Sequence, residues 1–405
     1  MSFFLNGGID LFLSLFIILI FGVLGGLLFE RIKLPKLIWY IILGILISPS
    51  VFNIIDKDIL NISSYLRQIA LIIILTRSGL SLDINGLKKI GRPAILMCFI
   101  PATFEIIGIT IFGPIILNIS IFESLLLGSV LAAVSPAIVA PRMINFIENN
   151  YGEKNHVPEL VLAGASCDDI YVIVLFYSFK NLVATNNINY ISILQIPISI
   201  VLGVLLGFIV GLILILTMKL LKLNKIINVI IILGASFGMV SLENILKPYF
   251  SISSLLGIIV MAILIAYKRH NDSIEIKKSY NALWQVFEIL LFVLVGASID
   301  IKYAFSIQGL LLIGVVFIGL IFRSIGVILS LIFTNYSKKE KIFIIISYLP
   351  KATVQASIGG IALMEGLSCG TIILTAAVIS ILITAPLGAI LIDNLYKKLL
   401  EKEYD

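Results

Sequence analysis

The chain has 405 residues, of which 60% are hydrophobic and 13% are charged, and its mean hydropathy is +1.14. Soluble globular proteins carry about a quarter of charged residues, so this composition excludes a water-soluble globule. The formal net charge is +6. We therefore expect an integral membrane protein whose surroundings are the lipid bilayer, with no nucleic-acid partner.

Apolar runs of about 20 residues follow one another along the chain, and each has the length that spans ~30 Å of hydrocarbon. Strands of a membrane barrel alternate in polarity and are about half as long, so helices are favoured. We predict an all-α polytopic protein with thirteen transmembrane helices at 8–29, 35–52, 62–82, 90–116, 119–145, 157–183, 188–218, 224–243, 250–268, 281–299, 305–334, 340–365 and 369–396. The first run lacks a preceding basic segment, so we expect it to remain as a span.

The loops between these spans predict the orientation of the chain. Taken alternately, the loops hold 21 Lys and Arg on one side and five on the other, namely Lys57, Arg67, Lys180, Lys247 and Lys302. Cytoplasmic loops collect basic residues. We expect the N-terminus outside and the C-terminus in the cytoplasm, in the plasma or inner membrane of a cell. The longest loops, 146–157 and 269–280, leave no room for a soluble domain.

Several charged residues fall inside the predicted helices. The cations are Arg77, Arg323 and Lys351, and the deeply embedded acids are Glu105, Asp168, Asp169 and Glu288. Such residues are costly in lipid and are functional candidates by default. Because an arginine stays charged, Arg323 needs a partner, and Glu105 is the best one available.

Two prolines interrupt predicted helices, Pro136 in "AAVSPAIVAP" and Pro350 in "SYLPKATVQASIGG". Each deprives the carbonyl four residues earlier, Ala132 or Ile346, of its helical donor. The polar side chains around them are Ser135, Thr353, Gln355 and Ser357. We predict two broken helices whose half-helix ends direct partial charges at the middle of the membrane. The alternative is an ordinary proline kink.

These unusual residues also repeat along the chain. Glu105 and Arg323 are 218 residues apart, and Pro136 and Pro350 are 214 apart. If the first six and the last six helices are two copies joined by the seventh, the copies run in opposite orientations. Inverted repeats of this kind are typical of secondary transporters.

Asp168 and Asp169 are neighbours in "GASCDDIYVIVLF". Their side chains diverge by about 100° around a helix, so they cannot face one cavity equally. Na+ and Li+ prefer oxygen ligands, which a carboxylate and the carbonyls of a broken helix supply. Burial and a second carboxylate both favour the protonated form, so one site can hold either a cation or a proton. The alternative is that these acids, Asp168 above all, are salt-bridge partners that join helices.

The segment "SPAIVAPRMINFIENNYGEKNHVPELVLAGASCDDI" resembles the monovalent cation–proton antiporters, and closely their NHA sodium/proton subgroup. Further similar motifs are "LTRSGLSLDINGLKK", "FIPATFE", "WQVFEILLFVLVGASIDI" and "YLPKATVQASIGG", so the resemblance runs from about residue 60 to 365. It implies an NhaA-like fold with elevator-like alternating access. It also implies a homodimer with a dimerisation panel at 8–82 and 224–299, a linker helix at 188–218 and a core domain at 90–183 and 305–396.

The resemblance also implies roles for individual residues. Asp169 would be the principal ion and proton carboxylate, with Asp168 beside it, and Glu105 and Arg323 would be the buried pair of the core. Lys351 would be the basic residue that stabilises the crossing of the broken helices. Ser135, Pro136, Pro350 and Thr353 would support that crossing. Many electrogenic relatives carry a lysine on the helix of Arg323, so this chain departs from their pattern and its stoichiometry is open.

We therefore predict a secondary antiporter that exchanges Na+ or Li+ for H+. The alternatives are a K+/H+ antiporter, a sodium-coupled symporter of an organic anion, and a channel or sensor. No nucleotide motif is present, and the chain is expected to be neither an enzyme nor dependent on a cofactor.

Overall fold

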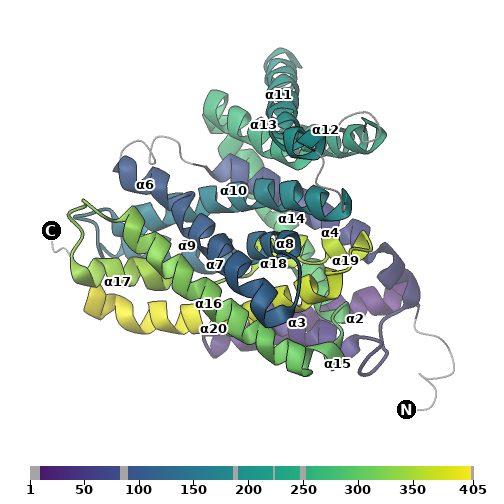
Figure 1. The fold of residues 1–405 in the computed structure, drawn as a ribbon. Helices are drawn as coiled ribbons and strands as arrows, with labels where there is room; N and C mark the ends of the chain where they lie inside the picture. Colours follow the sequence, from purple (N-terminus) through teal and green to yellow (C-terminus); the bar gives the residue numbers. More distant parts are fainter. Residues whose placement is uncertain (1–9, 83–89, 186–189, 222–223, 247–251, 403–405) are drawn as a thin grey trace.

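The computed structural model describes residues 10–82, 90–185, 190–221, 224–246 and 252–402, with no description of the side chains of 185 and 190–197. Within these residues the regular structure is helical, apart from one isolated bridge between Tyr151 and Lys402. The helices (Figure 1) are α2 Leu11–Arg31, α3 Lys36–Ile47, α4 Lys57–Ser81, α6 Arg92–Met97, α7 Ile100–Leu117, α8 Ile121–Leu131, α9 Pro136–Glu148, α10 Val157–Thr185, α11 Tyr190–Leu221, α12 Lys225–Leu246, α13 Ser254–Lys268, α14 His270–Ala297, α15 Ile301–Ala304, α16 Ile307–Ser330, α17 Lys338–Ser347, α18 Thr353–Ile358, α19 Ile361–Met364 and α20 Gly370–Leu399. The all-α prediction is confirmed.

The predicted spans all correspond to helices of the structure. Within the described ranges, ten helical segments are long and apolar enough to cross a membrane. Three further predicted spans fall on shorter apolar helices, Lys36–Ile47, Ser254–Lys268 and Thr353–Met364. The count of thirteen crossings therefore stays a prediction. The predicted starts at residues 8, 188 and 250 lie outside the described residues.

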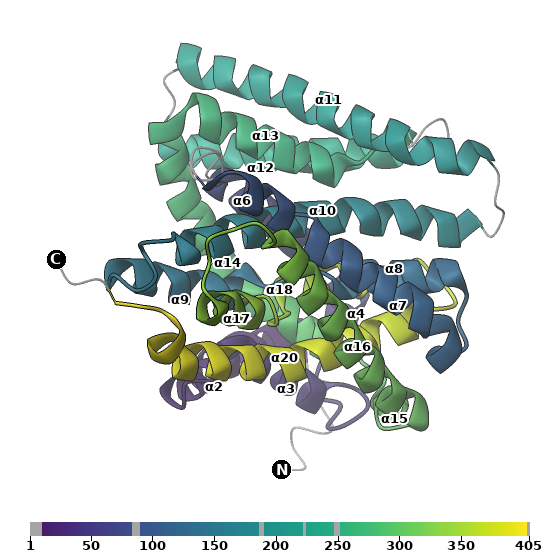
Figure 2. The same cartoon turned by 60° about the vertical axis from the view of Figure 1, so that its left-hand side comes forward.

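Helices α11, α12 and α13 form a layer of their own above α10 (Figure 2). Glycines on α11 allow its backbone to contact the backbone of α13 directly. A Cβ atom on Gly203 would lie 2.4 Å from the carbonyl oxygen of Ser253, and one on Gly207 would lie 2.2 Å from that of Gly257. Because no side chain separates the two backbones here, α11 is packed firmly on α13.

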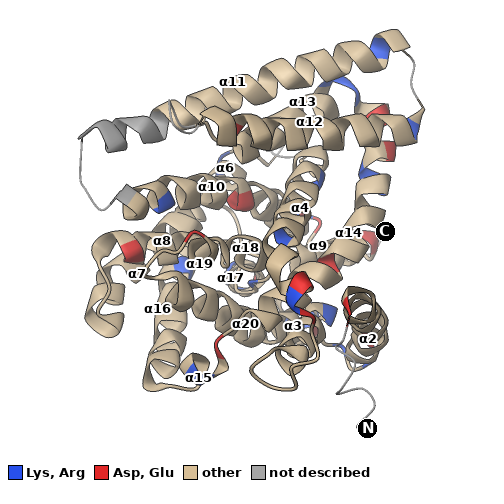
Figure 3. Cartoon of the chain, turned by 90° about the vertical axis from the view of Figure 1, so that its right-hand side faces the viewer, with Lys and Arg blue, Asp and Glu red and all other residues tan. Residues whose placement is uncertain are grey.

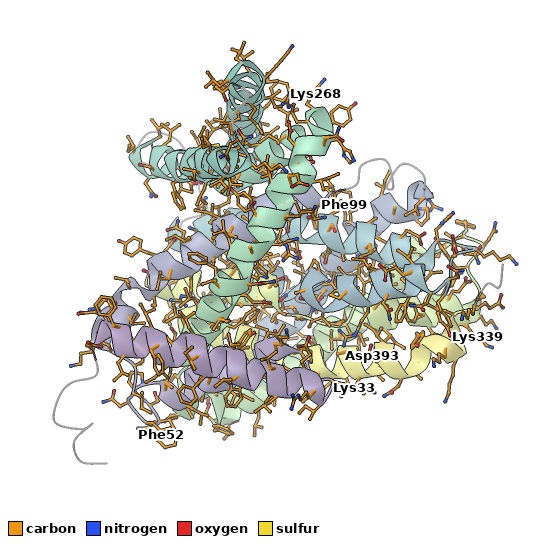
Figure 4. The ribbon with its side chains drawn as sticks, turned by 180° about the vertical axis from the view of Figure 1, so that it is seen from behind. Lys33, Phe52, Phe99, Lys268, Lys339 and Asp393 are labelled. Atoms are coloured by element: carbon orange, nitrogen blue, oxygen red, sulfur yellow. The ribbon has the colours of Figure 1, made fainter. Side chains whose placement is uncertain are left out.

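Most of the helical ribbon carries no charge (Figure 3). Lys339 lies at one side of Figure 4, and Phe52 lies at the other. The backbone N–H of Gly152 donates to the carbonyl of Glu401 at 2.8 Å. The chain near the C-terminus thus lies beside the loop between α9 and α10.

The predicted loop at 269–280 is wrong, because α14 begins at His270 and continues to Ala297. Ser273, Ile276, Tyr280 and Trp284 are buried at spacings of three and four residues. A polar sequence with a single apolar stripe forms a helix when that stripe packs against neighbours. Averaged hydropathy over the segment hides the stripe.

Two basic residues that the charge count assigned to loops, Arg67 and Lys180, are buried inside helices, and both fall within the predicted spans 62–82 and 157–183. Helix α4 begins at Lys57 and not near residue 62, so Arg67 lies well within it and is only 6% exposed. Lys180 lies within α10, is also 6% exposed, and pairs with Glu365 at 2.5 Å. Of the five basic residues that the charge count assigned to the less basic side, Lys247 lies outside the described residues.

We predict that Gly44→Val lowers the thermal unfolding temperature in detergent by at least a few degrees. Gly44 on α3 faces α14, and a Cβ atom there would lie 2.0 Å from the carbonyl oxygen of Val293. Overpacking of this kind costs about 1–3 kcal/mol because the backbones must separate. Gly234→Val on α12 is the matched control, since a Cβ atom there meets nothing within 4 Å. Equal unfolding temperatures for the two variants would contradict the close approach of α3 and α14.

Candidate functional site

Two helices are broken at the middle of the molecule, as the prolines predicted. Helix α8 gives way to α9 at residues 132–135, and α17 gives way to α18 at residues 348–352. The two non-helical segments touch, because the backbone N–H of Ser135 donates to the carbonyl of Pro350 at 2.8 Å. Irregular backbone at this depth requires partners within the protein. The crossing therefore depends on which groups bond to the freed backbone atoms.

Arg323 on α16 bonds to the carbonyl ends of both half-helices. Its Nη1 donates to the carbonyl of Ala132 at the end of α8, and its Nε donates to that of Tyr348 at the end of α17, at 2.8 Å. The carbonyl of Ala132 was thus correctly predicted to lose its helical donor. The carbonyl of Ile346 likewise has no donor at Pro350, but it accepts instead from the backbone N–H of Leu349 at 3.2 Å in a tight last turn.

Lys351 supplies the second cation at the crossing and is fully buried. Its Nζ lies 2.6 Å from Oε1 of Glu105 and donates to the carbonyl of Leu131. Its own backbone N–H donates to Oγ1 of Thr384 on α20 at 2.9 Å. Gln355 adds an amide donor to the same carbonyl of Leu131 at 3.3 Å. The negative end of the α8 dipole is therefore met by a charged and a polar donor.

The guanidinium of Arg323 also joins two carboxylates. Its Nη1 lies 3.0 Å from Oε2 of Glu105 on α7, and its Nη2 lies 2.7 Å from Oδ2 of Asp168 on α10. All three side chains are at most 1% exposed. The same Oδ2 accepts from the backbone N–H of Val134 at 2.9 Å. Asp168 is thus held by a cation and by the broken backbone, as the salt-bridge alternative described.

Asp169 is different from its neighbour. It is 4% exposed, and its buried Oδ1 has no hydrogen-bond partner. Over the part of the chain that the structure describes, no ion pair reaches this carboxylate. The site contains three carboxylates, those of Glu105, Asp168 and Asp169. Among the described residues, the cations paired within it are Arg323 and Lys351. If all five are charged, the site carries one negative charge more than its cations neutralise.

Other oxygens around the crossing also lack partners. The buried, unpartnered oxygens here are Oδ1 of Asp168, Oδ1 of Asp169, Oγ of Ser135 and Oε1 of Gln355. Within the described ranges, no cluster of three or more His, Cys, Asp or Glu side chains has the arrangement of a metal centre. Mixed hydroxyl, amide and carboxylate oxygens suit a hard monovalent cation that is carried as a substrate.

The remaining predicted site residues lie at the breaks themselves. Pro136 and Thr353 are the first residues of α9 and α18, and Thr353 is buried. Sequence reasoning missed Thr384, which is fully buried and is one of several small hydroxyl residues in the apolar part of α20. It also missed Gly388, where a Cβ atom would lie 2.3 Å from the ring of Pro350. Both residues lie on α20, and they contact Lys351 and Pro350 in the second non-helical segment.

Arg77 and Glu288, the other embedded charges, lie on α4 and α14 and are half-buried. Among the described residues no ion pair links either of them to Arg323 or Lys351. They are therefore not part of the crossing.

Comparison with known proteins gives consistent matches over nearly the whole chain. A family model described as "Sodium/hydrogen exchanger, transmembrane" matches residues 15–398. The chain is 33% identical over 398 residues to Sodium/hydrogen exchanger 9B2 of Homo sapiens, which covers 94% of this chain and 74% of that protein. It is 32% identical over 413 residues to Sodium/hydrogen exchanger 9B1 of Homo sapiens, covering 97% and 79%.

The fold also matches a solved structure, that of the sodium proton antiporter MjNhaP1 from Methanocaldococcus jannaschii. The TM-score is 0.80 with 21% identity, and the match covers 95% of this chain and 97% of the other. At this identity the likeness bears on the fold alone. With the family model and the relatives above, it follows that this chain belongs to the sodium/hydrogen exchanger family of transmembrane proteins.

Proposed function

We propose that this protein is a secondary antiporter that exchanges Na+ for H+ across a membrane by alternating access. The observation that carries the proposal is Asp169, a buried carboxylate without a partner beside two broken helices. The names of its relatives, sodium/hydrogen exchangers, support the same exchange.

In this proposal Asp169 binds the two substrates in turn. When it holds a proton it is neutral and suits its buried surroundings, and when it loses the proton its charge attracts a cation. The unpartnered oxygens of Ser135 and Gln355 are candidates to complete the ligand set. Asp168 contributes its free Oδ1 while its other oxygen stays bonded to Arg323. Because proton and cation need the same carboxylate, each displaces the other.

The surplus negative charge argues against the alternative of an organic-anion symporter, which would need a surplus of positive donors at its site. Li+ shares the ligand preference of Na+, and the larger K+ shares its charge, so the choice among these ions depends on the spacing of the oxygens. We propose Na+ as the physiological substrate because the family is that of sodium/hydrogen exchangers.

We further propose a homodimer in which a panel at 8–82 and 224–299 stays fixed and a core at 90–183 and 305–396 moves. The network of Arg323 supports the core as one body, because it ties α7, α8, α10, α16 and α17 together. The linker helix at 188–218 corresponds to α11, whose glycines pack on α13. The basic loops support a cytoplasmic C-terminus, an N-terminus outside, and a plasma or inner membrane location.

We predict that Asp169→Asn abolishes proton flux driven by Na+ in proteoliposomes, because an amide neither titrates nor attracts a cation. The measurement is a pH-sensitive dye inside the vesicles, with Na+, Li+ and K+ added in turn. Asp300→Asn is the matched control, since Asp300 is an exposed helix cap that Asn replaces well. Full flux in Asp169→Asn would refute the proposal, as would wild-type vesicles that respond to no cation.

We predict opposite effects of the two aspartates on stability in buffer without Na+. Asp168→Asn leaves Arg323 and the N–H of Val134 short of an anion, and breaking such a buried pair costs about 3–5 kcal/mol. Asp169→Asn removes a charge that has no partner, so it leaves stability unchanged or higher. Thermal unfolding in detergent measures both. Equal losses in the two variants would show that Asp169 is held as firmly as its neighbour.

We predict that transport is independent of membrane potential. Asp168 is paired with Arg323, which cannot release a proton, so Asp169 is left as the single exchanging carboxylate. One Na+ for one H+ moves no net charge. Each net charge moved would gain ~2.3 kcal/mol per 100 mV, which would change the flux many-fold. The measurement compares vesicles with the potential clamped at zero and at 100 mV, and a large difference would contradict one-for-one exchange.

A further inference from the structure

A second polar site lies away from the crossing, between α4, α10, α12, α13, α18 and α19. It is a cavity of about 220 Å³. The charged residues that line it are Arg67, Lys180, Glu243 and Glu365. It lies beside the first half of α4 and the last turns of α10 and α12.

Three of these four charges have partners. Nζ of Lys180 lies 2.5 Å from Oε1 of Glu365 and 5.0 Å from the ring centre of Tyr177. Oε2 of Glu243 accepts from the backbone N–H of Ser254 at 2.9 Å and from its hydroxyl. Both acids of the cavity therefore have partners. Glu243 bonds to Ser254 at the start of α13, and Glu365 pairs with Lys180.

Arg67 is the exception. Its Nε donates to the carbonyl of Ser63 at 3.3 Å, but its buried Nη1 has no hydrogen-bond partner. Over the described residues, no ion pair to this guanidinium is found, although it is 94% buried. Gly360 makes the space for it, because a Cβ atom there would lie 2.3 Å from Nη1. The guanidinium of Arg67, whose Nη1 has no hydrogen-bond partner, thus lines a polar cavity.

We propose that this cavity binds an oxyanion of the phosphate class through Arg67, either free phosphate or the phosphate of a lipid headgroup. The planar donors of arginine fit two oxygens of such a group, and the two carboxylates of the cavity already bond to Ser254 and Lys180. The cavity, of about 220 Å³, has room for a phosphate group with some of its hydration. The bound anion would pair with Arg67, to which no ion pair is found among the described residues.

The site also joins two sets of helices. Arg67 lies on α4 in the proposed panel, and Lys180 and Gly360 lie in or beside α10 and α19 in the proposed core. An anion held between them opposes their relative movement and would slow transport. This consequence rests on the proposed function, whereas binding of the anion does not.

The test is equilibrium binding to the purified full-length protein in a non-ionic detergent, in buffer free of Na+. The probes are radiolabelled inorganic phosphate, a short-chain phosphatidic acid and a phosphatidylcholine of the same chain length. We expect Arg67→Gln to weaken binding of the anionic probe by at least about tenfold and Arg67→Lys to retain part of it. Arg92→Gln is the matched control, because Arg92 is exposed on α6 and bonds to the carbonyl of Ile332.

Saturable phosphate binding that depends on Arg67 would identify a free anion as the ligand. Binding of phosphatidic acid alone, with the same dependence, would identify a lipid headgroup. Equal binding by Arg67→Gln and Arg92→Gln, or no binding of any anionic probe to the wild type, would overturn the proposal. Because the assay involves neither Na+ nor transport, its failure leaves the antiport proposal intact. The unfolding temperature of each variant checks that it is folded.

Discussion

The structure depends on one buried guanidinium. Arg323 bonds to the carboxylates of Glu105 and Asp168 and to the carbonyl ends of two broken helices. Four other helical segments therefore meet at a group that keeps its charge at any physiological pH. The half-helix ends carry partial negative charge and would be unstable in lipid without it. Breaking two helices at the centre of a membrane protein is possible here because this cation is present.

The same interaction divides the roles of the two adjacent aspartates. Asp168 is bound to Arg323 and to the backbone N–H of Val134, whereas Asp169 projects about 100° away and has no such partner. Lys351 is likewise occupied by Glu105. One carboxylate is thus left for exchange, and its environment favours whichever of proton or cation neutralises it. In the proposed antiport, Arg323 keeps a fixed positive charge in the site. The charge of Asp169 changes when it gains or loses a proton.

Much of this arrangement could be predicted from the sequence. Pro136 and Pro350 marked the breaks because proline removes a helical donor wherever it occurs. The bond from Arg323 to Asp168 was not predicted as such, because it depends on how α10 and α16 lie together, 155 residues apart. Arg67 was misplaced for two reasons. The charge count grouped it with the polar residues before the predicted span at 62, whereas α4 begins at Lys57, and the space beside Arg67 comes from Gly360, far along the chain.

The central claim is that one carboxylate holds either a proton or Na+. It is tested most directly by the proton release that accompanies Na+ binding to the purified protein in weakly buffered detergent solution. At a pH where Asp169 is protonated, the account predicts about one proton released for each Na+ bound, and none in Asp169→Asn. Binding of Na+ to the wild type without proton release would contradict it.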